Sequence, residues 1–150
     1  MLKSPITKLL CVLLILPTLI SSSASAAPEA NQDTRKLVHF PTPMRTHMLG
    51  NMRDHLTALH EIQAALAAGK LDQAADIAET RIGMSSLASH HAAQMAPYMP
   101  QPMQDIGTAM HHAASRFARS AHEGDLKKSL LDLSEITQQC VACHAAYRVH

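Results

Sequence analysis

Aromatic residues are scarce in this chain. Its 150 residues include two Phe, two Tyr and no Trp, so aromatic side chains make up only 3% of the sequence. Aromatic side chains normally supply much of the apolar area that a core buries. A helical domain of this size is therefore thinly packed unless a large apolar cofactor supplies the missing area. At about 25 cal/mol per Å² buried, such a cofactor adds several kcal/mol to stability, and we expect the chain without it to be loosely folded.

Several kinds of motif are also absent. The sequence contains no nucleophile elbow, no Gly-rich phosphate loop and no pair of carboxylates at a spacing that indicates acid–base catalysis. It contains no internal repeat and no low-complexity segment. Basic and acidic residues nearly balance, at 13 against 12, and no basic stripe marks a nucleic-acid surface. We therefore expect neither an enzyme of these classes nor a nucleic-acid-binding protein.

The first 26 residues have the pattern of a secretory signal peptide. Lys3 and Lys8 give a basic start, and residues 9–20 form an apolar run that is too short to span a bilayer comfortably. Residues 24–26 read Ala-Ser-Ala, a small-residue cleavage site, and we place the cut after Ala26. The alternative is an uncleaved membrane anchor. Cleavage leaves 124 residues, which suits one domain, with 11 basic residues against 12 acidic ones and no stable membrane insertion.

Four stretches after this segment have the three- and four-residue apolar spacing of amphipathic helices. They cover residues 42–68, 71 to the low nineties, 102–124 and 126 to about 147, and residues 27–41 precede them as a lead-in without helical period. Gly69 and Gly124 indicate helix ends, and Asp125 is placed to cap the fourth helix. Gly83 favours a kink or a break in the second helix. The pattern predicts an all-α, antiparallel four-helix bundle with a cofactor in its core.

Each predicted helix has an expected core face. The faces comprise Leu49, Met52, Leu56, Leu59 and Leu66 in the first helix, Leu71, Ala74, Ala78 and Ile82 in the second, Met103, Ile106, Met110, Ala113, Phe117 and Ala121 in the third, and Leu126, Leu130, Leu133, Thr137, Cys140, His144 and Tyr147 in the fourth. Val38 and Phe40 are expected to attach the lead-in to the helices. The face of the fourth helix therefore continues into the motif described next.

The most informative motif is the Cys-x-x-Cys-His sequence at residues 140–144, which is the attachment sequence of c-type haem. Residues i and i+3 lie on one face of a helix, so Cys140 and Cys143 can both reach the two vinyl groups of one porphyrin. His144 lies one turn after Cys140 and can present its imidazole to the iron. We predict that the two cysteines form thioethers with one haem and that His144 is the fifth iron ligand.

Three other interpretations of the cysteines stay open. A thioredoxin-like dithiol normally accompanies a βαβ pattern, which is not evident near this motif. A structural zinc site requires four ligands, of which the motif supplies two cysteines and one histidine. A purely structural disulfide is the third alternative.

The ending Cys-x-x-Cys-His-x-x-Tyr-Arg resembles that of the class II c-type cytochromes, the cytochrome c prime family. Its residues are Cys140, Cys143, His144, Tyr147 and Arg148. The resemblance covers about residues 42–150, and outside this ending it concerns only helix order. It implies a periplasmic haem protein that transfers single electrons to a transient redox partner or, in five-coordinate members, binds NO or CO. It also implies that Arg148 lies near the haem, the alternative being a solvated arginine. Family members often pair as homodimers.

The family divides at the first helix. Low-spin members have a Met there as sixth iron ligand, and five-coordinate members have a bulky apolar residue. Spacing to the second helix resembles that of the Met-ligated members and favours Met52, with Met48, one turn earlier, as the alternative. Leu49 stands four residues after Arg45, a place where the family often has its distal residue, and would then cap an open iron site. Methionines at helical spacing are also common core residues.

Eleven histidines are unusual in a chain of this length. The sequence contains the pairs His90-His91 and His111-His112, and methionines recur every fourth residue at Met95, Met99 and Met103. Imidazole is the commonest transition-metal ligand among side chains, and thioethers suit Cu(I). A His/Met-rich metal-binding module is therefore a further interpretation. The alternative is solvated or partly buried histidines and a methionine-lined loop that packs on the haem.

Overall fold

Four long helices make up most of the described chain, residues 32–150 of a computed structural model. They are α1 (Thr42–Ala67), α2 (Leu71–Arg81), α4 (Gln101–His122) and α5 (Leu126–Ala146). A short helix, α3 (Ala92–Met95), lies between two 3-10 turns, η1 (Met84–Ser86) and η2 (Ala96–Tyr98). The predicted signal peptide, residues 1–26, lies outside the described residues. Residues 34–150 form one unit, and the description below concerns that unit.

Local chemistry accounts for most helix ends. The Asp125 side chain accepts a hydrogen bond from the backbone N–H of Lys128 at 2.9 Å, which confirms the predicted cap of α5. Gly69 and Gly124 have positive φ angles of 69° and 77°, the left-handed conformation that glycine adopts without strain after a helix. α1 begins at Thr42, so Pro41 rather than Thr42 occupies the capping position.

The second helix is shorter than the sequence predicts, because α2 ends at Arg81. At Gly83 the chain turns closely back on the last turn of α2. A Cβ added to Gly83 would lie 2.6 Å from Oε2 and 2.8 Å from the backbone O of Glu79. Only glycine fits there, and the chain continues through η1, α3 and η2 instead of extending the helix.

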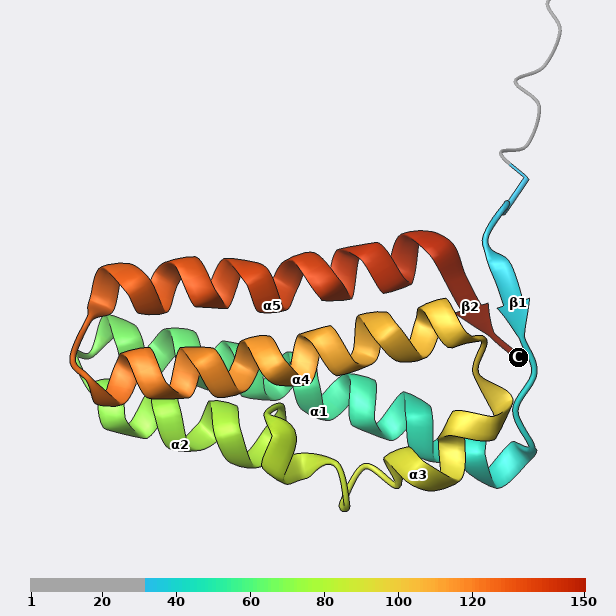
Figure 1. Cartoon of the computed structure of the whole chain (residues 1–150), viewed down its shortest axis with the longest axis horizontal. Helices are drawn as coiled ribbons and strands as arrows, with labels where there is room; N and C mark the ends of the chain where they lie inside the picture. Colours follow the sequence, from blue (N-terminus) through green and yellow to red (C-terminus); the bar gives the residue numbers. More distant parts are fainter. Residues whose placement is uncertain (1–31) are drawn as a thin grey trace, which may run out of the picture. The chain divides into compact units, whose positions relative to one another are not determined.

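The five helices pack together in the order that Figure 1 shows, with α4 (orange) beside both α5 (red) and α2 (yellow-green). α2 also packs against α1, whereas α1 and α5 are not among the closely packed pairs. The largest fully buried apolar side chains are Ile62 on α1, Ile82 after α2, Phe117 on α4 and Ile136 on α5. The core thus draws on every long helix.

Two of the four predicted core faces are correct. On α2 and its C-cap, Ala74, Ala78 and Ile82 are fully buried. On α4 the buried residues include Met103, Met110, Ala113, Phe117 and Ala121. These helices have a clear polar side, so apolar spacing alone identifies the buried side.

The predicted faces of α1 and α5 are partly wrong. Leu56 is 70% exposed and Leu130 is 51% exposed, and Leu49 and Leu126 are exposed as well. The buried side of α1 consists of Met48, His55, Ala58, Ile62, Ala65 and Leu66. The buried side of α5 consists of Ser129, Asp132, Leu133 and Ile136. Small and polar residues take core positions in both helices, so counting large apolar residues assigns the wrong side.

A two-stranded parallel sheet joins residues far apart in the sequence, and the all-α prediction missed it. β1 (Lys36–Val38) pairs with β2 (Tyr147–Val149), with Val38 opposite Val149. Tyr147 therefore lies in a strand rather than on the last helical face. Val38 and Phe40 are buried, as predicted. In Figure 1 both strands lie at the same end of the helices as α3.

Candidate cofactor site

A cavity of about 490 Å³ lies among α1, α4, α5 and the residues around α3 and β2. The predicted site residues that border it are Cys140, Cys143, His144, Arg148, Met48 and Met52. They come from α1, α5 and β2, so the fold brings both ends of the described chain to one place. Most of the other side chains around the cavity are apolar.

The two motif cysteines lie on α5 as free, half-buried thiols. Cys140 packs on the core cluster that contains Ile136, and its Sγ donates to the Ile136 carbonyl at 3.4 Å. Burial raises the pKa of Cys140, and burial together with the neighbouring Cys140 raises the pKa of Cys143. Both sulfurs are therefore neutral thiols near pH 7, whereas a reactive dithiol needs a lowered pKa. This chemistry disfavours the thioredoxin-like interpretation.

The third motif residue, His144, is exposed on the last turn of α5 and borders the cavity. Its carbonyl accepts a hydrogen bond from Nη1 of Arg35 at 3.5 Å. Arg148 also borders the cavity and lies opposite Leu37 in the sheet. The strand pair therefore holds the residues that follow the motif against the cavity.

The α1 wall carries all the sequence candidates for a sixth ligand. Met48 is buried, Met52 is half-buried and Leu49 is exposed, and all three border the same cavity as His144. Leu56 and Leu59 continue this wall further along α1. The exposed leucines of α1, Leu49 and Leu56, therefore border the cavity instead of entering the core, whereas Leu59 also packs on the core cluster.

Methionines gather at the end of the cavity near the strands. Met48, Met95 and Met103 are buried in one cluster with Val38 and Phe40. The half-buried residues packed on this cluster are Met44, Met52, Met99, Cys143, Tyr147 and Val149. The methionine loop of the sequence analysis thus lies next to the second motif cysteine.

Three histidines that lie close together also border the cavity, a grouping that was not predicted from the sequence. His55, His90 and His111 are 6%, 7% and 8% exposed and all border the cavity. Burial, followed by the nearby His90 and His111, lowers the pKa of His55 from 6.5 to about 4. Burial is also the main cause that lowers the pKa of His90 and of His111. All three imidazoles are neutral at pH 7. Their spacing in the sequence gives no signal, because three separate segments supply them.

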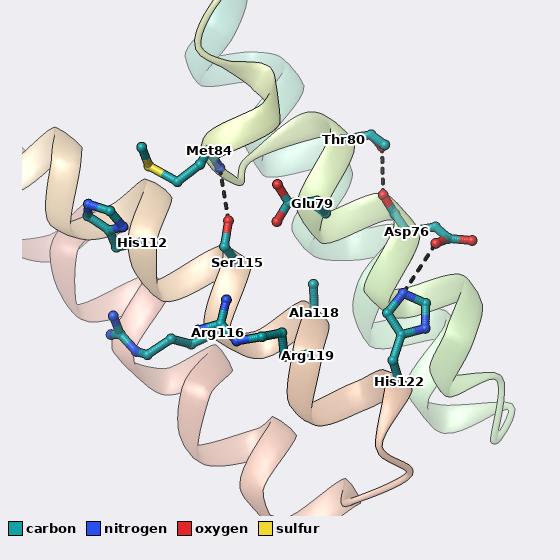
Figure 2. Close-up of a pocket in the computed structure, with 10 residues that line it drawn as sticks. All are labelled: Asp76, Glu79, Thr80, Met84, His112, Ser115, Arg116, Ala118, Arg119 and His122. Atoms are coloured by element: carbon teal, nitrogen blue, oxygen red, sulfur yellow. Dashed lines mark hydrogen bonds and ion pairs between the residues drawn. The ribbon is translucent and has the colours of Figure 1, made fainter.

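A second hollow, of about 640 Å³, lies between α2 and α4 and is shown in Figure 2. Its charged side chains are largely paired. His122 contacts Asp76 at 3.4 Å and Asp72 at 3.1 Å, and Arg116 pairs with Glu135 at 2.5 Å. It contains none of the predicted site residues, so we assign the cofactor site to the cavity described first.

Comparisons with protein-family models, curated proteins and solved structures found no match to this chain. Among residues 32–150, no helix has the length and apolar character needed to cross a membrane.

Proposed function

We propose that this chain is an exported c-type cytochrome that binds one haem covalently and transfers single electrons. The observation that carries the proposal is the convergence of the motif on one cavity. Cys140, Cys143 and His144 border it from α5, and Met48 and Met52 border it from α1. In this proposal the four long helices form an antiparallel bundle with the haem in its core.

The residues present fit a haem. A volume of about 490 Å³ falls within the range of cofactor sites, which are mostly apolar and largely preformed. Both thiols lie on one side of the cavity, as attachment to one porphyrin requires. The α1 wall presents Leu49, Leu56 and Leu59, whose exposed apolar surface a flat macrocycle would cover. Covering it would supply the apolar area that the aromatic-poor sequence lacks.

Each residue then has a defined role. When bound, haem supplies a one-electron ferric/ferrous couple, whose potential the axial ligands set. Cys140 and Cys143 would hold the porphyrin, His144 would bind the iron, and Met52 would be the sixth ligand, with Met48 as the alternative. A Met/His pair raises the reduction potential, and the apolar walls exclude water. Arg148, at the cavity edge, offsets the negative charge of the propionates.

The remaining parts of the proposal follow from the resemblance and the export pattern. The protein works in the periplasm after cleavage of residues 1–26. Its partner is a transient redox protein that approaches an exposed haem edge. It binds no nucleic acid, is not an enzyme, and forms a homodimer if it follows many family members.

A five-coordinate haem that binds NO or CO is the second candidate. The observation that favours it is Leu49, which borders the cavity beside Met48 and stands where the family often places its distal residue. In this case neither methionine binds the iron, and carbon monoxide binds rapidly because no ligand has to leave.

Absorption spectra of the reduced protein test the proposal. We expect sharp low-spin α and β bands in the wild type that disappear in Met52→Ala. The bands should persist in Met84→Ala, a matched control because Met84 lies in the other hollow. A high-spin wild-type spectrum would overturn methionine ligation and favour the five-coordinate candidate. Absence of the added haem mass from the denatured protein would overturn haem attachment itself.

A further inference from the structure

We propose that His55, His90 and His111 form a binding site for one Cu(I) ion, separate from the haem ligands. These residues are not among the proposed haem ligands, but they border the same cavity. Cys143 packs on the cluster around Met48 and Met103, whereas His55 lies seven residues after Met48 on α1 and His111 lies eight residues after Met103 on α4. At 1.5 Å per residue, this is roughly 10 Å along each helix axis, and Met52 lies one helical turn before His55.

The three rings come from three segments and lie close together. The centroids of His55 and His90 are 4.8 Å apart, those of His90 and His111 are 5.5 Å apart, and those of His55 and His111 are 6.2 Å apart. Imidazoles that share one ion, each with its nitrogen roughly 2 Å from it, have centroids about 5–6 Å apart. The spacing therefore matches a shared ion.

Hydrogen bonds fix the tautomers of two of these rings. His111 Nδ1 lies 2.5 Å from the carbonyl of Ile82, so this nitrogen carries the proton and donates it. Ser86 Oγ donates its proton to the Gly83 carbonyl at 2.7 Å, so it accepts from His90 Nδ1 at 3.2 Å. In these tautomers the Nε2 atom of each ring carries the lone pair, although the His90 ring also lies near the Arg81 backbone and the His111 ring near that of Gly83. A ligand histidine usually donates its other N–H to a protein oxygen in this way.

The third ring, that of His55, has a nitrogen for which the protein supplies no hydrogen-bond partner. His55 Nε2 is buried and has no hydrogen-bond partner. A buried polar atom without a partner costs about 1–3 kcal/mol. Binding an ion at this nitrogen would compensate that cost, and the low pKa of His55 keeps its ring neutral at pH 7.

The charge around the cluster favours a monovalent ion. The carboxylate of Asp54 acts on the His55 ring, and it pairs with Arg81, whose guanidinium Nε donates to Asp54 Oδ2 at 3.2 Å. A divalent ion would therefore keep its full charge in a buried site, at a high desolvation cost. Cu(I) carries one charge, binds neutral imidazoles and thioethers, and needs few ligands.

The donor atoms are not arranged as a finished metal site. Within residues 32–150, no three His, Cys, Asp or Glu side chains stand ready to hold a metal ion together. Binding of one Cu(I) ion by the three rings therefore requires their side chains to move from these positions.

Two further histidines connect the cluster with the surface. His91 is exposed, and its ring stacks on that of half-buried His47 at 4.3 Å. His47 lies close enough to His90 for its charge to lower the pKa of that ring. His47 Nε2 is likewise buried without a partner. An ion could therefore pass along successive imidazoles from the surface to the cluster.

A competition titration tests the site. Cu(I) is supplied without oxygen in the presence of a chromophoric Cu(I) chelator, and the copper transferred to the full mature chain is measured. We expect one equivalent to bind in the wild type and the affinity to fall about 100-fold or more in His55→Leu, because a ligand is lost. His60→Leu is the matched control, since His60 is exposed on the same helix, and should bind like the wild type.

Free thiols and methionines could also take up Cu(I), so two measurements isolate the imidazoles. In a Cys140→Ser/Cys143→Ser variant, which cannot attach haem, the one equivalent should persist. X-ray absorption of the copper-loaded wild type should show nitrogen neighbours. Sulfur neighbours alone, unchanged affinity in His55→Leu, or no copper held by the wild type would each overturn the proposal. Because the variant without the two cysteines carries no haem, a failure of copper binding can be distinguished there from a failure of haem attachment.

Discussion

Acidification should destabilise the domain through His55, and the size of the effect follows from its pKa. His55 has a folded-state pKa of about 4, against an ordinary value of 6.5. Between these values the unfolded chain binds a proton that the folded chain does not bind. Stability therefore falls as the pH falls from about 6.5 to about 4, and it is unaffected by this group well above pH 6.5.

The expected loss is measurable. One pKa unit corresponds to about 1.4 kcal/mol, so the full difference is worth roughly 3 kcal/mol below pH 4. Between pH 7 and pH 5 the linkage relation gives a loss of about 2 kcal/mol. In a urea titration this loss moves the midpoint by roughly 1 M. His90 and His111, whose pKa values are also lowered, act in the same direction.

Urea unfolding followed by far-ultraviolet circular dichroism, with a metal chelator present, measures this loss. His55→Leu should have a smaller difference in unfolding free energy between pH 7 and pH 5 than the wild type. At pH 7 it should be at least as stable, because an unpartnered buried nitrogen is removed. His60→Leu should keep the wild-type pH dependence. Equal losses in the wild type and His55→Leu would refute the burial argument.

Three other substitutions should change the free energy of unfolding for reasons that the structure gives. Gly83→Ala places a Cβ 2.6–2.9 Å from atoms of Glu79 and should lower the free energy of unfolding by about 1–3 kcal/mol. Gly107 lies inside a helix, and a Cβ added there has no neighbouring atom within 4 Å. Gly107→Ala should therefore raise the free energy of unfolding by up to about 1 kcal/mol. Asp132→Ala removes the buried carboxylate that accepts a hydrogen bond from Ser120 Oγ at 2.5 Å and should lower the free energy of unfolding by about 2 kcal/mol. A decrease below about 0.5 kcal/mol, measured by urea unfolding, would contradict this prediction.

Helix ends marked by a capping or glycine residue were predictable because they depend on neighbouring residues, whereas the end of α2 at Arg81 was not predicted. The cap at Asp125 and the ends near Gly69 and Gly124 are local features, and the structure has them where the sequence places them. The buried faces of α1 and α5 could not be predicted, because a leucine that borders a cavity has the same spacing as a leucine in a core. Leu56 illustrates this: it is apolar, in phase and 70% exposed.

Features made by distant segments could not be predicted from spacing. The pairing of Val38 with Val149 joins residues more than 100 positions apart, and two three-residue strands carry too little pattern to indicate a partner. The histidine cluster could not be predicted for the same reason, since His55 belongs to α1 and His111 belongs to α4. In contrast, the haem-attachment prediction for Cys140 and Cys143 needs no information from distant segments, because it depends on a spacing of three residues, and it stays a prediction.

The parallel strand pair has a consequence for the order in which the domain assembles. Closing a loop of roughly 110 residues costs about 4 kcal/mol of chain entropy if nothing else has formed. Helices and contacts between successive helices form first, because their loops are short. β1 and β2 should thus come together last, after the helices have brought them close. In the proposed cytochrome, this order would leave the part of the cavity that Tyr147 borders uncovered until the strands pair, which would leave time for a rigid macrocycle to be inserted.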